Sequence, residues 1–264
     1  MKIYVMVDVE GISGIYTKQQ VIPNESRFCE GRRYITEEIN ACVKGLKAGG
    51  ADEVVVYDCH GGSYAAIWED LCSEADYYIS GSMPGVRFYG SDGADAMVFL
   101  GYHAMAGTQG AVLEHTYSSV GIQNIWVNGK AVGEIAMDAA IAGEQGIPVI
   151  MVSGDDKACE EAREIMPYVH TACVKRGMTS FGAMLLPKEK AHKVIFETAK
   201  EAVENMKKCS IFTFEKPMSA RVEVVERIQI NNNCNAPYKK ICGGRVFEVV
   251  ADTAQELLFR ATSI

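Results

Sequence analysis

Two acidic residues near the start of the chain give the first chemical signal. Asp8 and Glu10 lie at the end of the first apolar segment, residues 2–11, which is predicted to be a strand. Side chains two residues apart in a strand project from the same face. Two buried acids on one face repel each other unless a cation or a proton lies between them. The pair therefore indicates a cation site.

Other metal-ligand residue types follow strands or begin a helix elsewhere. His60 comes after the apolar run 54–57, His103 follows 97–102, and Glu134 begins a predicted helix. Ligands of an open α/β sheet bind beyond the carboxyl ends of its strands, so these side chains should converge on one crevice. Carboxylates mixed with imidazoles suit zinc or another divalent transition metal better than calcium or magnesium. We therefore expect a metallohydrolase.

Each of these residues alone has a simpler interpretation. A single histidine is more often structural than a ligand, and Glu134 by itself fits a solvated glutamate in a first helical turn. Asp58 either anchors a loop or orients the ring of a liganding histidine. Agreement among separate strands favours the metal site, whereas no one residue does.

The elements that must position these residues alternate between strand and helix. Predicted strands at 53–58, 76–80, 96–102 and 147–152 are interspersed with helices at 25–48, 64–72, 133–146 and 157–166, and Asn128-Gly129 predicts a hairpin. This order indicates an α/β fold, with a mainly parallel sheet flanked by helices. Beyond residue 180 the sequence predicts a long amphipathic helix at 191–206, a strand at 219–230 and a helix at 254–261. We therefore expect a catalytic α/β domain at 1–180 and a smaller α+β subdomain at 181–264 that serves packing, assembly or covering of the site.

Composition excludes several classes of protein. The net charge is 26 − 34 = −8 without a basic cluster, so nucleic acid and acidic membrane surfaces are poor partners. No apolar run approaches the ~20 residues of a membrane span, and no signal peptide pattern opens the chain. Nine cysteines at irregular spacings, without a C-x-x-C pair, fit buried thiols in a reducing cytoplasm.

Six separated motifs resemble, in order and spacing, the zinc-dependent D-aminopeptidase family, whose type member is self-compartmentalising and associated with dipeptide transport. They are Asp8-x-Glu10-Gly11, Asp58-x-His60, Gly101-Tyr102-His103-Ala104, His115, Val132-Gly133-Glu134 and Val152-Ser153-Gly154-Asp155-Asp156. The likeness covers residues 1 to about 175. One position departs from the family signature, since Met6 stands where the family has a serine.

The resemblance implies two zinc ions per subunit. Asp8 would bridge them, Glu10 and His103 would complete one ion, and His60 and Glu134 the other. His115 would be the catalytic histidine, close to the metals without binding them, and would carry a proton to the departing amine. It also implies short peptides with N-terminal D-residues such as D-alanine as substrates, and a homo-oligomer, a decamer in the family.

The segment 114–117, which contains His115, is predicted to be extended. In a strand, Glu114 would point to the opposite face, so Glu114 is the weaker candidate for proton transfer. The competing interpretation of His115 itself is a core histidine with satisfied hydrogen bonds.

Two other classes of function remain open. Asp8-x-Glu10 and Gly154-Asp155-Asp156 are similar to the acidic motifs of haloacid-dehalogenase-like, magnesium-dependent phosphatases. That chemistry needs an aspartate at the second position, where this chain has Glu10, and it has no use for the three histidines at 60, 103 and 115. The other class is a non-catalytic metal-binding protein that forms rings, against which the presence of His115 beside all five proposed ligands argues.

Overall fold

The computed structural model describes residues 1–264 except 62–63, 82, 228–229, 231–235 and 264. A seven-stranded sheet forms its centre, in the order β3-β2-β1-β4-β7-β8-β9. The strands are β1 (Lys2–Val7), β2 (Glu53–Asp58), β3 (Tyr77–Ile79), β4 (Ala96–Leu100), β7 (Val149–Asp155), β8 (His170–Thr179) and β9 (Gly182–Leu185). Neighbouring strands are parallel except for the β8–β9 pair. The prediction of a mainly parallel sheet is confirmed.

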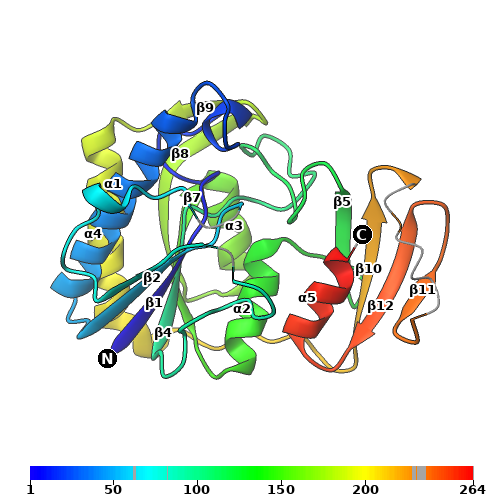
Figure 1. The fold of residues 1–264 in the computed structure, drawn as a ribbon. Helices are drawn as coiled ribbons and strands as arrows, with labels where there is room; N and C mark the ends of the chain where they lie inside the picture. Colours follow the sequence, from blue (N-terminus) through cyan, green and yellow to red (C-terminus); the bar gives the residue numbers. More distant parts are fainter. Residues whose placement is uncertain (62–63, 82, 228–229, 231–235, 264) are drawn as a thin grey trace.

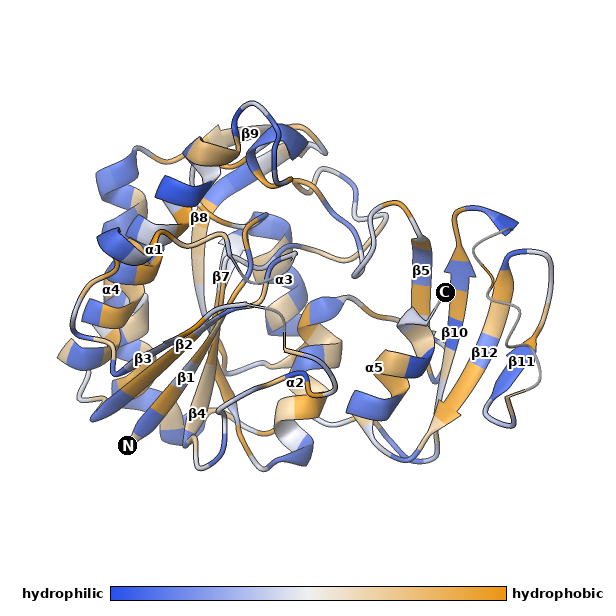
Figure 2. Ribbon diagram, viewed as in Figure 1, coloured by the Kyte–Doolittle hydropathy of each residue, from blue (hydrophilic) through white to orange (hydrophobic). Residues whose placement is uncertain are grey.

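Helices cover both faces of this sheet (Figure 1). They are α1 (Phe28–Ala48), α2 (Glu134–Glu144), α3 (Asp156–Ile165) and α4 (Lys188–Asn205). One apolar core lies between the sheet and the pair α1 and α4, and a second lies on the side of α2 and α3. The central strands are apolar along most of their length, whereas α1 and α4 carry polar residues on their outer sides (Figure 2). This pattern is typical of a sheet buried on both faces.

A second, antiparallel sheet has the order β11-β12-β10-β5-β6 and lies beside α5 (Figure 1). Its strands are β5 (Ile122–Val127), β6 (Lys130–Ala131), β10 (Met218–Val224), β11 (Lys239–Ile241) and β12 (Val246–Ala251), and α5 spans Ala254–Thr262. The side chain of Thr253 caps α5 by accepting a hydrogen bond from the Glu256 amide. The expected strand at 219–230 ends earlier, at Val224, and its positions 228–229 lie outside the described residues.

Two segments pack on the far side of the domain boundary that the sequence predicts at residue 180. The hairpin β5–β6 precedes residue 180 but pairs with β10 in the second sheet. The helix α4 follows residue 180 but packs on α1 and β8 of the central sheet. Apolar residues of α4 such as Ile195 complete the core over α1, which explains its position.

Two further elements differ from the sequence prediction. The predicted helix at 64–72 is reduced to a short 3-10 turn, Trp68–Asp70, because Asp58 and Asn40 take up the neighbouring backbone amides. The segment 114–117 is not a strand, because Leu113 and Tyr117 adopt positive φ angles of 53° and 59°, which break an extended run. Among the described residues no helix is both long and apolar enough to cross a membrane.

Candidate metal centre

The acidic pair lies in the turn after β1. The strand ends at Val7, before both acids. The prediction that strand alternation places the two carboxylates on one face is therefore wrong. The turn instead runs against the end of β4, where the Gly11 amide donates to the Gly101 carbonyl at 2.7 Å. A Cβ on Gly11 would lie 1.9 Å from the Tyr102 carbonyl oxygen, so only glycine permits this approach. The close contact brings Asp8 and Glu10 beside His103.

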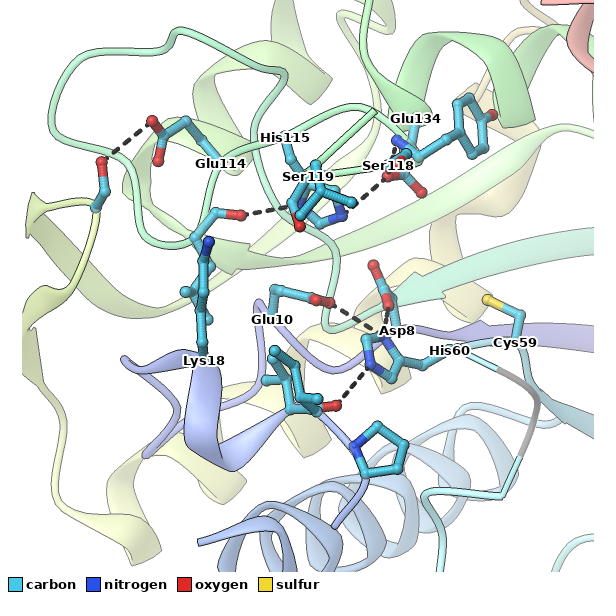
Figure 3. Close-up of a pocket in the computed structure, with 18 of the residues that line it drawn as sticks. Asp8, Glu10, Lys18, Cys59, His60, Glu114, His115, Ser118, Ser119 and Glu134 are labelled. Carbon is cyan, nitrogen blue, oxygen red and sulfur yellow. Dashed lines mark hydrogen bonds and ion pairs between the residues drawn. The ribbon is translucent and has the colours of Figure 1, made fainter. Parts of the chain in front are cut away.

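The five predicted ligands come together beyond the carboxyl ends of the central strands, and Figure 3 shows four of them, Asp8, Glu10, His60 and Glu134. His60 Nδ1 lies 2.9 Å from Asp8 Oδ1 and 3.3 Å from Glu10 Oε2. His103 Nε2 lies 3.4 Å from Asp8 Oδ2 and 3.2 Å from Glu134 Oε1. Ligand atoms of Asp8, Glu10 and His103 all lie within 4.8 Å of one another.

The other ring nitrogen of each imidazole contacts a backbone carbonyl. His60 Nε2 lies 3.0 Å from the Val21 carbonyl oxygen, and His103 Nδ1 lies 3.0 Å from the Ala104 carbonyl oxygen. A carbonyl only accepts, so each of these nitrogens carries the proton. The second nitrogen of a neutral ring is then a lone pair directed at carboxylate oxygens. Such a contact is repulsive unless a cation or a further proton lies between, and it is the usual arrangement of metal-binding histidines.

The pKa values of Asp8 and of the two imidazoles reflect the same close contact. Burial opposes the ionised form of Asp8, but the neighbouring imidazoles of His103 and His60 hold its pKa well below the usual range. Burial likewise disfavours the charged imidazoles, yet the neighbouring carboxylates raise the pKa values of His60 and His103 well above normal. Without a bound cation, the two imidazoles therefore carry extra protons that balance the charge of the carboxylates.

Two buried atoms of the cluster show what a cation would add. Glu10 Oε2 and His103 Nε2 have no hydrogen-bond partner within the described part of the chain. Buried polar atoms are rarely left in this state, and an ion is one of the standard explanations. Nitrogen and carboxylate donors in this combination fit zinc. The residues present thus fit a metal centre.

His115 lies on the wall of the pocket that faces Asp8 and Glu10 (Figure 3). Its ring stacks on that of His103, with 4.1 Å between centroids, and its Nε2 lies 3.7 Å from Glu134 Oε1. His115 Nδ1 donates to the Leu113 carbonyl, since the two atoms are 2.9 Å apart, which leaves Nε2 as the basic nitrogen. Ligand atoms of His103, His115 and Glu134 also lie within 4.8 Å of one another.

The two acids that the sequence left open have local roles. Asp58 Oδ2 accepts a hydrogen bond from the Ala66 amide, so Asp58 anchors the following loop. Glu114 points away from Asp8 and His60 (Figure 3) and accepts from the Ser180 hydroxyl at 3.1 Å. Its direction matches the prediction, although the segment is a loop.

A pocket of about 570 Å³ opens over this cluster. Acidic and histidine side chains of the site line it together with Arg87, Lys18, Tyr117 and Phe181. That volume fits a small ligand.

Sequence reasoning missed two buried charged groups at the site. Lys175 on β8 is buried and donates to the carbonyls of Glu10, Ile12 and Ile15 at 2.6–2.8 Å. Burial lowers its pKa to about 8, against the attraction of nearby carboxylates. Asp138 lies within the apolar helix α2 and pairs with Arg87. A lone acid in the sequence EIAMDAAIAGE was the available signal for Asp138, whereas no sequence pattern marks Lys175.

The site also explains the position that departs from the family signature. Met6 is fully buried in β1 and belongs to the core on the α2 side of the sheet. It therefore contributes packing, and the carboxylates begin two residues later.

Comparisons with known proteins agree with this geometry. A family model described as D-aminopeptidase matches residues 1–262. A D-aminopeptidase of Bacillus subtilis (strain 168) is 33% identical over 256 residues, which cover 97% of this chain and 90% of the relative. The structure of a zinc-dependent D-aminopeptidase from Bacillus subtilis, described as a self-compartmentalizing protease, superposes with a TM-score of 0.91 at 31% identity, covering 99% and 97% of the two chains. The resemblance seen in the sequence is confirmed, and this chain belongs to the D-aminopeptidase family.

Proposed function

We propose that the protein is a zinc metallopeptidase that removes the N-terminal residue from short peptides, with a preference for D-amino acids such as D-alanine. The observation that carries the proposal is the pair of imidazoles whose second nitrogens face buried carboxylates. Family membership and the zinc dependence stated for the similar structure support it. A phosphatase is not favoured, because that chemistry needs an aspartate where this chain has Glu10 and has no use for the histidines that line the pocket.

The five clustered side chains are our proposed ligands for two zinc ions. Asp8 would be shared between the ions, with Glu10 and His103 on one and His60 and Glu134 on the other. Zinc in such a site supplies a hydroxide near neutral pH and polarises the scissile carbonyl. The short contacts of Asp8 with both His60 and His103 are what support a shared role.

His115 is our proposed proton carrier. Its Nδ1 is held by the Leu113 carbonyl, so Nε2 is the atom that would accept a proton and pass it to the departing amine. His115 reaches the pocket from a loop, opposite Asp8 and Glu10 (Figure 3). The acidic lining of the pocket also suits a substrate ammonium, so N-acetylated peptides should be poor substrates.

The test is hydrolysis of a chromogenic D-alanine amide by zinc-loaded protein. We expect turnover that exceeds that of the L-alanine analogue, that is abolished by a chelator and restored by zinc. A matched assay with a chromogenic phosphate ester addresses the phosphatase alternative. Turnover of the phosphate ester alone would overturn the proposal, and silence on both substrates would favour a non-catalytic metal-binding protein.

We further propose a closed homo-oligomer, a decamer, in which the second sheet and α5 contribute to packing or assembly. The self-compartmentalizing behaviour stated for the similar structure supports an assembly. Light scattering should find a mass several times that of the 28.8 kDa chain; a fully active monomer would contradict this. A cytoplasmic location is also proposed, since the cysteines in the described ranges are all free.

A further inference from the structure

Arg87 is a cationic side chain of the pocket that the proposed chemistry does not use. Its Nε and Nη2 donate to Asp138 Oδ1 and Oδ2 at 2.8 and 2.6 Å. The Asp138 side chain is completely buried, while Arg87 is 18% exposed and lines the pocket. A guanidinium carries five N–H donors, and Nη1 makes no hydrogen bond within the described ranges. Donors therefore remain for a ligand.

Arg87 is fixed before any ligand arrives. Its backbone amide donates to Gln255 Oε1 of α5 at 3.0 Å, and its guanidinium is held by both oxygens of Asp138. Asp138 in turn accepts from the Tyr102 hydroxyl at 2.7 Å, so the carboxylate is itself held in place. A side chain that is already ordered loses little conformational entropy on binding.

One residue separates Arg87 from the proposed metal ligands. The guanidinium lies 5.6 Å from the centre of the Tyr117 ring, and the Tyr117 amide donates to Glu134 Oε1 at 2.7 Å. Tyr117 and Glu134 both line the pocket with Arg87. Tyr117 thus lies between Arg87 and Glu134 on the wall of the pocket. A short peptide whose amino end lies at the proposed metal ligands can therefore extend past Tyr117 towards the guanidinium.

Lys18 is the competing cation on the pocket wall. It is exposed, and its Nζ lies 5.7 Å from the centre of the exposed Phe181 ring. A lysine ammonium is a strongly hydrated point charge on a flexible stem, whereas a planar guanidinium matches the two oxygens of a carboxylate. The anchored arginine is the better carboxylate receptor.

We propose that Arg87 binds the free C-terminal carboxylate of the substrate and so selects very short peptides, dipeptides above all. This assignment rests on the aminopeptidase function proposed above and adds a determinant of substrate length and charge. Arg87 acts on binding and does not touch the scissile bond. The Asp138 carboxylate positions it.

The experiment compares D-alanyl-D-alanine with its C-terminal amide, which differ only in the charge at the far end. Wild-type, zinc-loaded protein should hydrolyse the free acid with a kcat/KM about 10- to 100-fold above that of the amide, the range for hydrogen bonds to a charged group. In Arg87→Met this ratio should fall towards one, mainly through KM of the acid. Lys18→Met is the matched control and should keep the wild-type ratio.

Removal of Arg87 alone leaves Asp138 buried without its partner, which destabilises the fold. The double variant Arg87→Met, Asp138→Asn avoids this, because a neutral amide still accepts from Tyr102, and its ratio should also fall towards one. A wild-type ratio near one, a wild-type ratio in the folded double variant, or a lost ratio in Lys18→Met would each overturn the assignment. No turnover of either substrate by the wild type would instead overturn the proposed function, and the assignment with it.

Discussion

Lys175→Met should weaken both the fold and the metal site. Lys175 Nζ donates to three buried carbonyls in the turn after β1, at 2.6, 2.8 and 2.7 Å. Methionine fills similar space but leaves all three oxygens without a donor. Each buried acceptor left unpaired costs about 1–3 kcal/mol, and part of this is offset because an ammonium is no longer buried. We expect a net loss of about 3 kcal/mol in the free energy of unfolding.

Urea unfolding of the zinc-free protein, followed by circular dichroism, measures that loss. The matched control is Lys157→Met on α3, whose Nζ pairs with the exposed Glu160 at 2.8 Å. This variant should unfold at the wild-type urea concentration, since exposed pairs contribute little. If Lys175→Met also unfolds at the wild-type concentration, the three hydrogen bonds do not hold the turn and the reasoning is refuted.

A metal readout separates stability from function. The turn held by Lys175 carries Glu10, so a looser turn should reduce zinc affinity by about tenfold, as changes in the residues that support metal ligands commonly do. Competition with a chromogenic chelator gives the affinity directly. Wild-type zinc affinity in a destabilised Lys175→Met variant would limit Lys175 to a structural role.

Three further predictions concern the site. His115→Ala should keep its zinc and its assembly while turnover falls by about 10²–10⁴-fold, and lost zinc would make His115 a ligand instead. Elemental analysis should find about two zinc ions per chain, and Glu134→Ala should reduce this number; a wild-type stoichiometry of one that Glu134→Ala leaves unchanged would contradict a dinuclear site. Burial raises the pKa of Glu161 from 4.5 to about 7, so the folded zinc-free protein keeps a proton that the unfolded chain releases in this window, and its stability falls as pH rises through it. Glu161→Gln should remove up to about 3 kcal/mol of this dependence between the two pH limits, and an unchanged pH profile of urea unfolding would count against the raised pKa.

The sequence predicted that the five proposed ligands lie close together because one rule covers most of them. Asp8, His60 and His103 follow parallel strands, and the carboxyl ends of such strands meet at one edge. The rule works although β1 ends before the acids, since the turn that carries them is hydrogen-bonded to the end of β4. The local conformation around His115 was not predictable, because left-handed residues at 113 and 117 depend on contacts with distant segments, such as the bond from the Leu113 amide to the Ser180 carbonyl.

The supporting residues escaped prediction for a related reason. The partners of Lys175 are backbone carbonyls about 160 residues away in the chain, and carbonyls leave no trace in a sequence. Arg87 lies in a loop without periodicity, and only the fold brings it beside Asp138. A sequence therefore indicates the residue types that can bind a metal, whereas the residues that support them are identified only from the three-dimensional structure.

The exchange of segments between the two sheets has a consequence for synthesis of the protein. The hairpin β5–β6 leaves the ribosome about 90 residues before its partner β10. Until then β5 presents an open edge with Ile122, Ile125 and Val127, which are all buried in the finished fold. The partly synthesised protein therefore exposes apolar residues that favour aggregation. At this stage the central sheet and every proposed zinc ligand have already been synthesised. Gln255, which holds the Arg87 backbone amide, is synthesised after all five proposed zinc ligands, so Arg87 gains this contact later than the ligands form.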